Sequence, residues 1–259
     1  MQLFVVGPPR SGMTIVTQFL NRHGDIEIFD EIDLIHVDRG LAVGTLGAFL
    51  LERGMYEAYQ QRARETSDPA VALRATMTEL AHPHRIWGEK NPRYATELAT
   101  VRRIFPESII LFVLRDPRDI VNSCLLHRDS PMRADTDFWI ADTVTEALTL
   151  VWRCLEPLTA WKPEVVAVRY EAFTARPAAV LDAVLGAWGL NFSDFATPLA
   201  HPAPPTAGDH QFFREGVALP WKIGNLSPLR PKSFPRERID ADDPAWLDVD
   251  ALARRFGYH

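Results

Sequence analysis

Short, almost wholly apolar runs alternate along this chain with longer segments whose apolar residues recur at the spacing of a helix. Residues 3–6, 26–29, 109–114 and 165–168 are predicted strands, and residues 85–87 are a further, brief one. The run at 109–114 (IILFVL) is apolar at every position, which is typical of a central strand in a parallel sheet covered on both faces. The pattern therefore predicts a buried sheet.

Helices are expected between these runs, at residues 13–23, over most of 34–82 with breaks near Gly54 and Asp68, and at 94–105, from Pro117 onward, 136–161, 177–188 and 243–256. Strands that alternate with helices predict an α/β fold of the P-loop type, with three layers around a central, mostly parallel sheet. Residues 198–235 are rich in proline and are expected to be an extended loop region. The whole chain, residues 1–259, is expected to be a single domain.

Composition narrows the class of protein. Hydrophobic residues make up 47% of the chain, enough for a sizeable core, and the net charge of −6 argues against a general nucleic-acid binder. No apolar run approaches the ~20 residues that cross a bilayer, and the start lacks the features of a secretory signal. We expect no membrane span and a cytoplasmic protein. Cys124 and Cys154 lie in apolar helical segments and are expected to be buried thiols rather than disulfide or metal ligands.

The loop GPPRSGMT (residues 7–14) lies between a predicted strand and a predicted helix. It has the glycine spacing and the terminal threonine of a P-loop, GxxxxGK[ST], but Met13 stands in the lysine position. Glycines let the backbone wrap an anion, and the start of the next helix presents free N–H groups. The alternative is a tight strand-to-helix turn without a ligand. Arg10, Ser11 and Thr14 add donors to the loop and favour anion binding.

The missing lysine favours a donor group with less charge than the γ-phosphate of a nucleoside triphosphate. Kinases and NTPases manage that phosphate with the P-loop lysine and Mg²⁺. A sulfuryl group carries less charge and needs no metal, and Arg10 supplies a planar fork of donors for phosphate or sulfuryl oxygens. No metal site is expected. A Mg²⁺-dependent small-molecule kinase, with Asp116 or Asp119 on the metal, is the rival interpretation.

A second basic motif, RDPRDIVNS (residues 115–123), follows the strongest predicted strand. Ligands of open α/β sheets bind at the carboxyl ends of the strands, where Arg115 is expected to lie. Ser123 comes about two turns into the next helix, so the arginine and the hydroxyl are a sensible pair for a second phosphate. The alternative is that Arg115 and Asp116 form a surface ion pair, which would contribute little.

These motifs, followed by RYEAF (residues 169–173) and GVALPWKIGNL (residues 216–226), resemble those of sulfotransferases in type and in order. The resemblance is greatest to the bacterial and Golgi-type members, including tyrosylprotein sulfotransferases, and it extends from Gly7 to about Leu226. It implies transfer of a sulfuryl group from 3′-phosphoadenosine 5′-phosphosulfate to an acceptor hydroxyl, with adenosine 3′,5′-bisphosphate as the second product.

The resemblance also implies which residues bind this co-substrate. Arg115 and Ser123 would hold the 3′-phosphate, Tyr170 would lie near the adenosine, and Lys222 resembles a late basic residue that reaches the phosphates. The 5′-phosphosulfate would lie on the first loop, at Pro9, Arg10, Ser11, Gly12, Met13 and Thr14.

A transferase of this kind needs a base for the acceptor hydroxyl. Glu31 ends the second predicted strand on the same side as the first loop, and it matches the base position of tyrosylprotein sulfotransferases. An unpaired carboxylate, desolvated in a pocket, would have a raised pKa suited to proton abstraction. The alternatives are that Asp30 is the base or that Asp30 or Glu31 caps the next helix. His36 and His127 would be the next candidates.

Lys90, in WGEKNP (residues 87–92), resembles the family's lysine–x–proline turn beside the sulfuryl group. Its ammonium would stabilise charge on the leaving 5′-phosphate. The alternative is a surface ion pair between Glu89 and Lys90. Arg93 is a further candidate for contact with the acceptor or the sulfate.

The acceptor is not encoded in any recognisable motif. A sugar, a lipid, a peptide tyrosine and a secondary metabolite all remain open, as does the oligomeric state. A non-catalytic nucleotide-binding protein is a second rival to the transferase, although the presence of both Glu31 and Lys90 argues against it.

Overall fold

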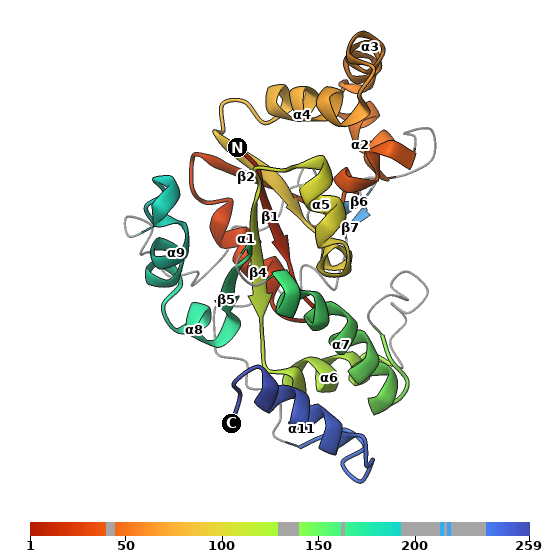
Figure 1. Ribbon diagram of the computed structural model, residues 1–259, viewed down its shortest axis with the longest axis vertical. Helices are drawn as coiled ribbons and strands as arrows, with labels where there is room; N and C mark the ends of the chain where they lie inside the picture. Colours follow the sequence, from red (N-terminus) through yellow and green to blue (C-terminus); the bar gives the residue numbers. More distant parts are fainter. Residues whose placement is uncertain (40–44, 129–139, 162–163, 193–212, 215–216, 219–236) are drawn as a thin grey trace.

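The computed structural model describes residues 1–39, 45–128, 140–161, 164–192, 213–214, 217–218 and 237–259 (Figure 1). A five-stranded sheet lies at its centre, with the strand order β2-β3-β1-β4-β5 and every pairing parallel. The strands are β1 (Leu3–Val6), β2 (Ile26–Asp30), β3 (Ile86–Lys90), β4 (Ile109–Leu114) and β5 (Val166–Arg169). The predicted α/β fold with a central parallel sheet is confirmed.

Helices cover both faces of the sheet. Successive strand residues point to opposite sides, and on β1 both sets are apolar and need cover. On β1, Leu3 and Val5 pack with the apolar residues of α1 (Met13–Leu20), α8 (Tyr170–Ala175) and α9 (Pro177–Leu185). Phe4 and Val6 face the opposite layer, which contains α5 (Leu98–Ile104), α6 (Pro117–Leu125) and α7 (Val144–Trp161). Figure 1 shows α8 and α9 on one side of β4 and β5 and α7 on the other. The three predicted layers are therefore present.

The remaining elements are η1 (Leu34–Arg39), α2 (Thr45–Glu52), α3 (Tyr56–Thr66), α4 (Pro69–Leu80), η2 (Pro92–Thr96), η5 (Gly186–Trp188), the short pair β6 (Phe213–Arg214) and β7 (Val217–Ala218), and α11 (Trp246–Arg255). Of these, η1, α2, α3, α4, η2 and α11 add to the second of the helical layers, and η5 follows α9 in the first. The predicted break at Asp68 is a helix cap, because its carboxylate accepts the backbone N–H groups of Ala70 and Val71. Figure 1 shows α6, α7 and α11 gathered at the end of the sheet toward which β4 points.

Two helix boundaries differ from the sequence-based prediction because polar side chains limit the helices. The first helix ends at Leu20 rather than residue 23, since the Asn21 side chain bonds both the N–H and the C=O of Ile28 on β2. The predicted start of the long helix at residue 136 lies outside the described residues, but residues 140–143 are not helical and α7 begins at Val144, where the Thr143 hydroxyl accepts the N–H of Glu146.

Three further segments were predicted with wrong bounds. The brief strand at 85–87 continues to Lys90, since its pairing with β2 runs from Ile86 to Lys90 without interruption. The expected helix at 94–105 is divided into η2 and α5, with Glu97 between them. The last helix is also shorter than predicted, at Trp246–Arg255.

Within the described residues no helix has both the length and the apolar character needed to span a membrane. The loop predicted at 198–235 lies almost entirely outside those residues, apart from the four residues of β6 and β7. The single domain of residues 1–259 stays a prediction.

Candidate active site

The loop at residues 7–14 turns sharply between β1 and α1, and two glycines make the turn possible. Gly7 has φ of 152°, and a Cβ there would lie 2.5 Å from the backbone oxygen of Val113 on β4. Gly12 has φ of 97°, and a Cβ there would lie 2.2 Å from the ring of Tyr170. No larger residue fits either position without movement of the backbone or the ring.

The same loop presents donors suited to an anion. Ser11 is fully buried, and its Oγ has no hydrogen-bond partner among the described residues. Buried hydroxyls are normally bonded, so this oxygen points to a ligand. Pro9 and Met13 are buried in the loop, and Thr14 lies in the first turn of α1, where backbone N–H groups are available. These residues fit a phosphate or sulfate group.

Arg10 connects this loop to α6 and adopts a left-handed backbone conformation, with φ of 68°. Its Nε donates to Ser123 Oγ at 2.9 Å, and its guanidinium lies 3.1 Å from His127 Nε2. Burial, followed by the nearby charge of Arg115, lowers the pKa of Arg10. The structure thus brings together two predicted site residues, Arg10 and Ser123, that are distant in the sequence.

His127 is held neutral by this arrangement. Burial and the positive charge of Arg10 both lower its pKa. An arginine only donates hydrogen bonds, so Nε2 accepts from Arg10 and the ring proton lies on Nδ1. His127, considered above only as a reserve base, is therefore a partner of the loop arginine.

Arg115 lies at the carboxyl end of β4, as predicted, and only 4% of its surface is exposed. It donates to the backbone oxygen of Arg10 at 3.1 Å and to Asp119 at 3.3 Å, and its guanidinium lies 4.7 Å from the centre of the Tyr170 ring. The alternative of an ion pair with Asp116 is wrong. Asp116 instead pairs with Arg118 at 2.6 Å and caps α6, whose first residue is Pro117.

Lys90 lies between two carboxylates at the ends of β2 and β3. Its Nζ is 2.5 Å from Asp30 Oδ1 and 2.5 Å from Glu31 Oε1. The side chains of Lys90 and Asp30 are almost fully buried, at 3% and 1% exposure, whereas that of Glu31 is 36% exposed. Glu31 is therefore paired rather than the unpaired, desolvated carboxylate that the sequence suggested. It also has a left-handed backbone, with φ of 51°.

Glu89 is fully buried, and the surface ion pair with Lys90 is therefore wrong. Its carboxylate accepts the N–H groups of Asp33 and Leu34 at 2.8 and 2.9 Å, the hydroxyl of Tyr94 at 2.5 Å and the amide of Asn91 at 3.0 Å. Burial raises the pKa of Glu89 to about 7 against the opposing effect of these hydrogen bonds. Glu89 therefore caps the start of η1, a role that the sequence analysis considered for Asp30 or Glu31.

Lys222 lies outside the described residues. Arg93 has an exposed side chain at the start of η2, where its N–H donates to Asn91. His36 lies 3.5 Å from Glu97 rather than beside Lys90. Both cysteines are buried, and burial raises the pKa of Cys124 and of Cys154 to about 12, as expected of inert thiols.

Sequence reasoning missed the residues that support the site. Glu89, Asn91 and Tyr94 form a polar cluster under the Glu31 turn, and Glu171 accepts the N–H of Asp116. One signal was available for Glu89. A carboxylate between Gly88 and Lys90 becomes buried as soon as β3 is extended through those residues, and a buried carboxylate needs donors.

The fold and the site together define a P-loop-type α/β protein with groups suited to an anion at the carboxyl ends of β1 and β4. Residues 2–194 match the model of the sulfotransferase family. The chain therefore belongs to that family, whose sulfuryl donor is 3′-phosphoadenosine 5′-phosphosulfate.

Individual relatives agree with this assignment. A candidate protein-tyrosine sulfotransferase of Caenorhabditis briggsae is 28% identical over 137 residues, which are 50% of this chain and 44% of that protein. The match thus spans less than half the length of that relative. Among solved structures, the sulfotransferase domain of the Synechococcus PCC 7002 olefin synthase has a TM-score of 0.62 at 16% identity, over 100% of this chain and 95% of the other. The sulfotransferase domain of the curacin biosynthetic pathway has a TM-score of 0.59 at 14% identity, over 99% and 97%. At these identities both show a shared fold.

Proposed function

We propose that this protein transfers the sulfuryl group of 3′-phosphoadenosine 5′-phosphosulfate to an acceptor hydroxyl by direct in-line displacement. The acceptor oxygen forms a bond to sulfur as the bond from sulfur to the 5′-phosphate oxygen breaks. The acceptor proton passes to Glu31, and adenosine 3′,5′-bisphosphate leaves. Positioning and fixed charge supply the catalysis, without a covalent enzyme intermediate.

The contact of Arg10 with both anion motifs is the observation that carries this proposal. Its side chain bonds Ser123 of α6, and its backbone oxygen accepts from Arg115 of β4. The loop for the 5′ side and the pair for the 3′ side therefore meet at one residue. That arrangement suits a nucleotide with phosphates on both its 5′ and 3′ positions, and neither a 5′-monophosphate nor a lone sulfate needs both.

Glu31 supports the role of general base by its position and exposure. It is the more exposed of the two carboxylates that contact Lys90, so an acceptor hydroxyl can approach it. Lys90 holds its Oε1, and the N–H of Glu31 donates to the backbone oxygen of Lys90 at 3.0 Å. Orientation by two contacts is what a base needs.

Lys90 has a more indirect part in this proposal than the sequence suggested. Its ammonium is buried between carboxylates, so it orients Glu31 first and adds positive charge to the crevice second. β3 pairs with β1 at Lys90 and Val5, which places this charge next to the start of the anion loop. Arg10 is then the residue that contacts the transferring group.

Labelled phosphosulfate donor, incubated with the protein and a pooled extract of small molecules, tests the transfer. We expect a labelled acceptor and release of adenosine 3′,5′-bisphosphate without added metal. Calorimetry gives an independent test of the site, with tighter binding of the bisphosphate than of adenosine 5′-phosphate. Equal affinity for the two nucleotides would contradict the proposal, and phosphate transfer from ATP that depends on Mg²⁺ would favour the kinase instead.

A further inference from the structure

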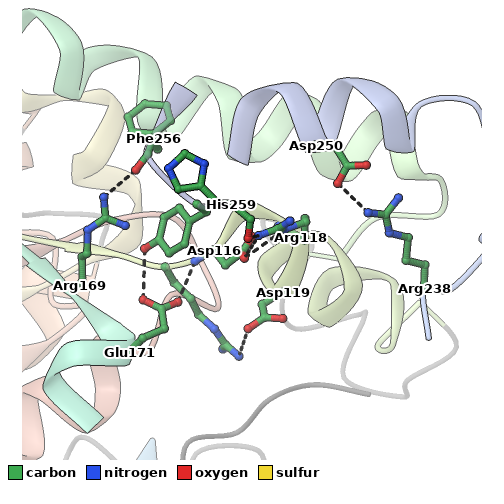
Figure 2. A network of polar contacts seen from close by, with 11 residues as sticks. Asp116, Arg118, Asp119, Arg169, Glu171, Arg238, Asp250, Phe256 and His259 are labelled. Atoms are coloured by element: carbon green, nitrogen blue, oxygen red, sulfur yellow. Dashed lines mark hydrogen bonds and ion pairs between the residues drawn. The ribbon is translucent and has the colours of Figure 1, made fainter. Parts of the chain in front are cut away.

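Residues 256–259, which follow α11, lie against the carboxyl ends of β4 and β5 (Figure 2). Arg169, the last residue of β5, donates to the backbone oxygen of Phe256 at 2.7 Å, and its guanidinium lies 4.5 Å from the centre of the Tyr258 ring. Gly257 allows the chain to turn here, with φ of 75°, and a Cβ there would lie 3.1 Å from Arg169. The segment is therefore closely fitted to β5.

Glu171 connects this segment to the second anion motif. One of its carboxylate oxygens accepts the hydroxyl of Tyr258 at 3.2 Å, and the other accepts the backbone N–H of Asp116 at 3.0 Å. Burial and the negative charge of Glu171 raise the pKa of Tyr258, so the phenol keeps the proton that it donates. Tyr258 and Asp116 are thus joined through a single carboxylate.

Two neighbouring contacts join the start of α8 to the end of β4. Tyr170 lies under the guanidinium of Arg115, and its neighbour Glu171 bonds the neighbour of Arg115, Asp116. Two consecutive residues of α8 therefore hold two consecutive residues at the end of β4. Any shift of Glu171 acts directly on the backbone beside Arg115.

A second contact joins the segment to the same motif. The Asp116 carboxylate is occupied by Arg118, whose guanidinium also lies 3.4 Å from the backbone oxygen of His259. Figure 2 shows Asp116, Arg118 and His259 close together on one side and Arg169, Glu171 and Phe256 on the other. Residues 256–259 thus contact both Glu171 and Arg118, the two residues that bond Asp116.

We propose that Tyr258 is a positioning residue for the 3′-phosphate subsite: through Glu171 it fixes the backbone at Asp116, and thereby the direction of the Arg115 guanidinium. This inference rests on the proposed function, which assigns the 3′-phosphate of the nucleotide to Arg115 and Ser123. Tyr258 does not itself contact the nucleotide in this proposal.

The matched control is Arg238. Like Tyr258, it makes one polar contact with a carboxylate and one contact between a guanidinium and an aromatic ring, but it makes them within the α11 region. Arg238 pairs with Asp250 at 2.6 Å and lies 4.8 Å from the centre of the Trp246 ring. Figure 2 shows this pair on the side of the view away from Phe256. A role limited to the packing of α11 would make Arg238 and Tyr258 equivalent.

The test measures dissociation constants for adenosine 3′,5′-bisphosphate and adenosine 5′-phosphate by calorimetry, on the intact chain. Tyr258→Phe removes only the hydroxyl and keeps the ring under Arg169. We expect its affinity for the bisphosphate to fall by roughly two- to tenfold, as for the loss of one hydrogen bond. The affinity for the monophosphate should stay unchanged. Glu171→Ala should reduce the preference further, whereas Glu171→Gln, which keeps an acceptor for Asp116, should retain most of it.

The outcomes separate this inference from the proposed function. Without any preference for the bisphosphate in the unsubstituted protein, the assignment of the 3′-phosphate fails. A preference that Tyr258→Phe and Glu171→Ala both leave intact overturns the positioning role alone. If Arg238→Ala lowers the preference as much as Tyr258→Phe does, the effect is one of α11 packing and the inference is likewise wrong. Melting temperatures identify unfolded variants, and Tyr258→Phe remains decisive if Glu171→Ala does not fold.

Discussion

The two halves of the candidate site differ in the charges that they bring together. At the ends of β1 and β4 lie two arginines, Arg10 and Arg115. Burial lowers the pKa of Arg10, and the nearby charge of Arg115 lowers it further. At the ends of β2 and β3, by contrast, one ammonium is shared by two carboxylates. The first half concentrates positive charge where an anionic nucleotide would bind, and the second places a single positive charge between two carboxylates. In the proposed mechanism, nucleotide binding and proton transfer therefore depend on separate sets of residues.

The largest effect is expected from Glu31→Gln, which breaks the β2–β3 half without touching the other. The amide keeps the shape of the side chain but cannot accept the acceptor proton, so turnover should fall by roughly 10²–10⁴-fold. The affinity for adenosine 3′,5′-bisphosphate should be unchanged. Steady-state kinetics with a confirmed acceptor and calorimetry measure the two quantities.

Asp25→Asn is the control for Glu31→Gln, because Asp25 is a partly exposed carboxylate just before β2 that pairs with Arg85. It should leave turnover as it is. A folded Glu31→Gln variant that binds the nucleotide and turns over at the unsubstituted rate would remove Glu31 from the mechanism and make Asp30 the next candidate.

Protonated Glu89 should contribute about 3 kcal/mol to the free energy of unfolding at low pH, because its pKa rises from 4.5 to about 7 on folding. The folded state then holds this proton more tightly than the unfolded state does. The contribution of Glu89 is fully present below pH 4.5 and is lost as the pH rises through 7. Stability should therefore fall with pH across this window, and Glu89→Gln should flatten that part of the curve.

Urea unfolding at several pH values, with the difference between the two proteins taken at each, isolates Glu89 from the other carboxylates. Tyr94 and Asp33 are the other titratable groups next to it. Parallel curves for Glu89→Gln and the unsubstituted protein would mean that Glu89 stays charged throughout.

The arginine half is tested by Arg115→Ala. Loss of its charged hydrogen bonds should weaken binding of adenosine 3′,5′-bisphosphate by about 1.5–3 kcal/mol. Binding of adenosine 5′-phosphate should change little. Arg128→Ala is the control. Arg115 precedes α6, whereas Arg128 follows α6 and pairs with Asp240. A uniform loss for both nucleotides would show that Arg115 supports the whole loop rather than the 3′-phosphate.

The smallest effect is expected on stability, from the close contact between Gly12 in the loop at residues 7–14 and Tyr170 of α8. Gly12→Ala and Gly54→Ala both place an alanine at positive φ, but only at Gly12 would the new Cβ meet a neighbour, the Tyr170 ring. Overpacking should make Gly12→Ala less stable than Gly54→Ala by about 1–3 kcal/mol in urea unfolding. Replacement of Tyr170 by alanine in the same chain should relieve that difference. Equal stabilities of the two single variants would mean that the ring moves aside without cost.

The fold could be predicted from the sequence because its two central strands, β1 and β4, are short and apolar at every position. The run at Ile109–Leu114 is correct to the residue, and the first anion motif follows from the glycines and their spacing. These features are local, so a pattern of neighbouring residues is enough to identify them.

The polar support of the site could not be predicted, because it depends on contacts between distant segments. Glu89 and Asp33 are 56 residues apart, and Glu171 and Tyr258 are 87 apart. The error at Glu89 began with the strand boundary. A strand ending at residue 87 leaves the next residues in an exposed turn, where an ion pair with Lys90 is the natural interpretation.

Asp33 has a consequence for the design of more stable variants. Its backbone is left-handed, with φ of 62°, and its carboxylate accepts from Asn91 at 3.1 Å. Asp33→Gly would relieve the backbone cost of that conformation, yet it would also loosen the turn that carries Glu31. A search for thermostable mutants would therefore tend to select changes here that trade catalytic rate for stability, and screens should score the two properties separately.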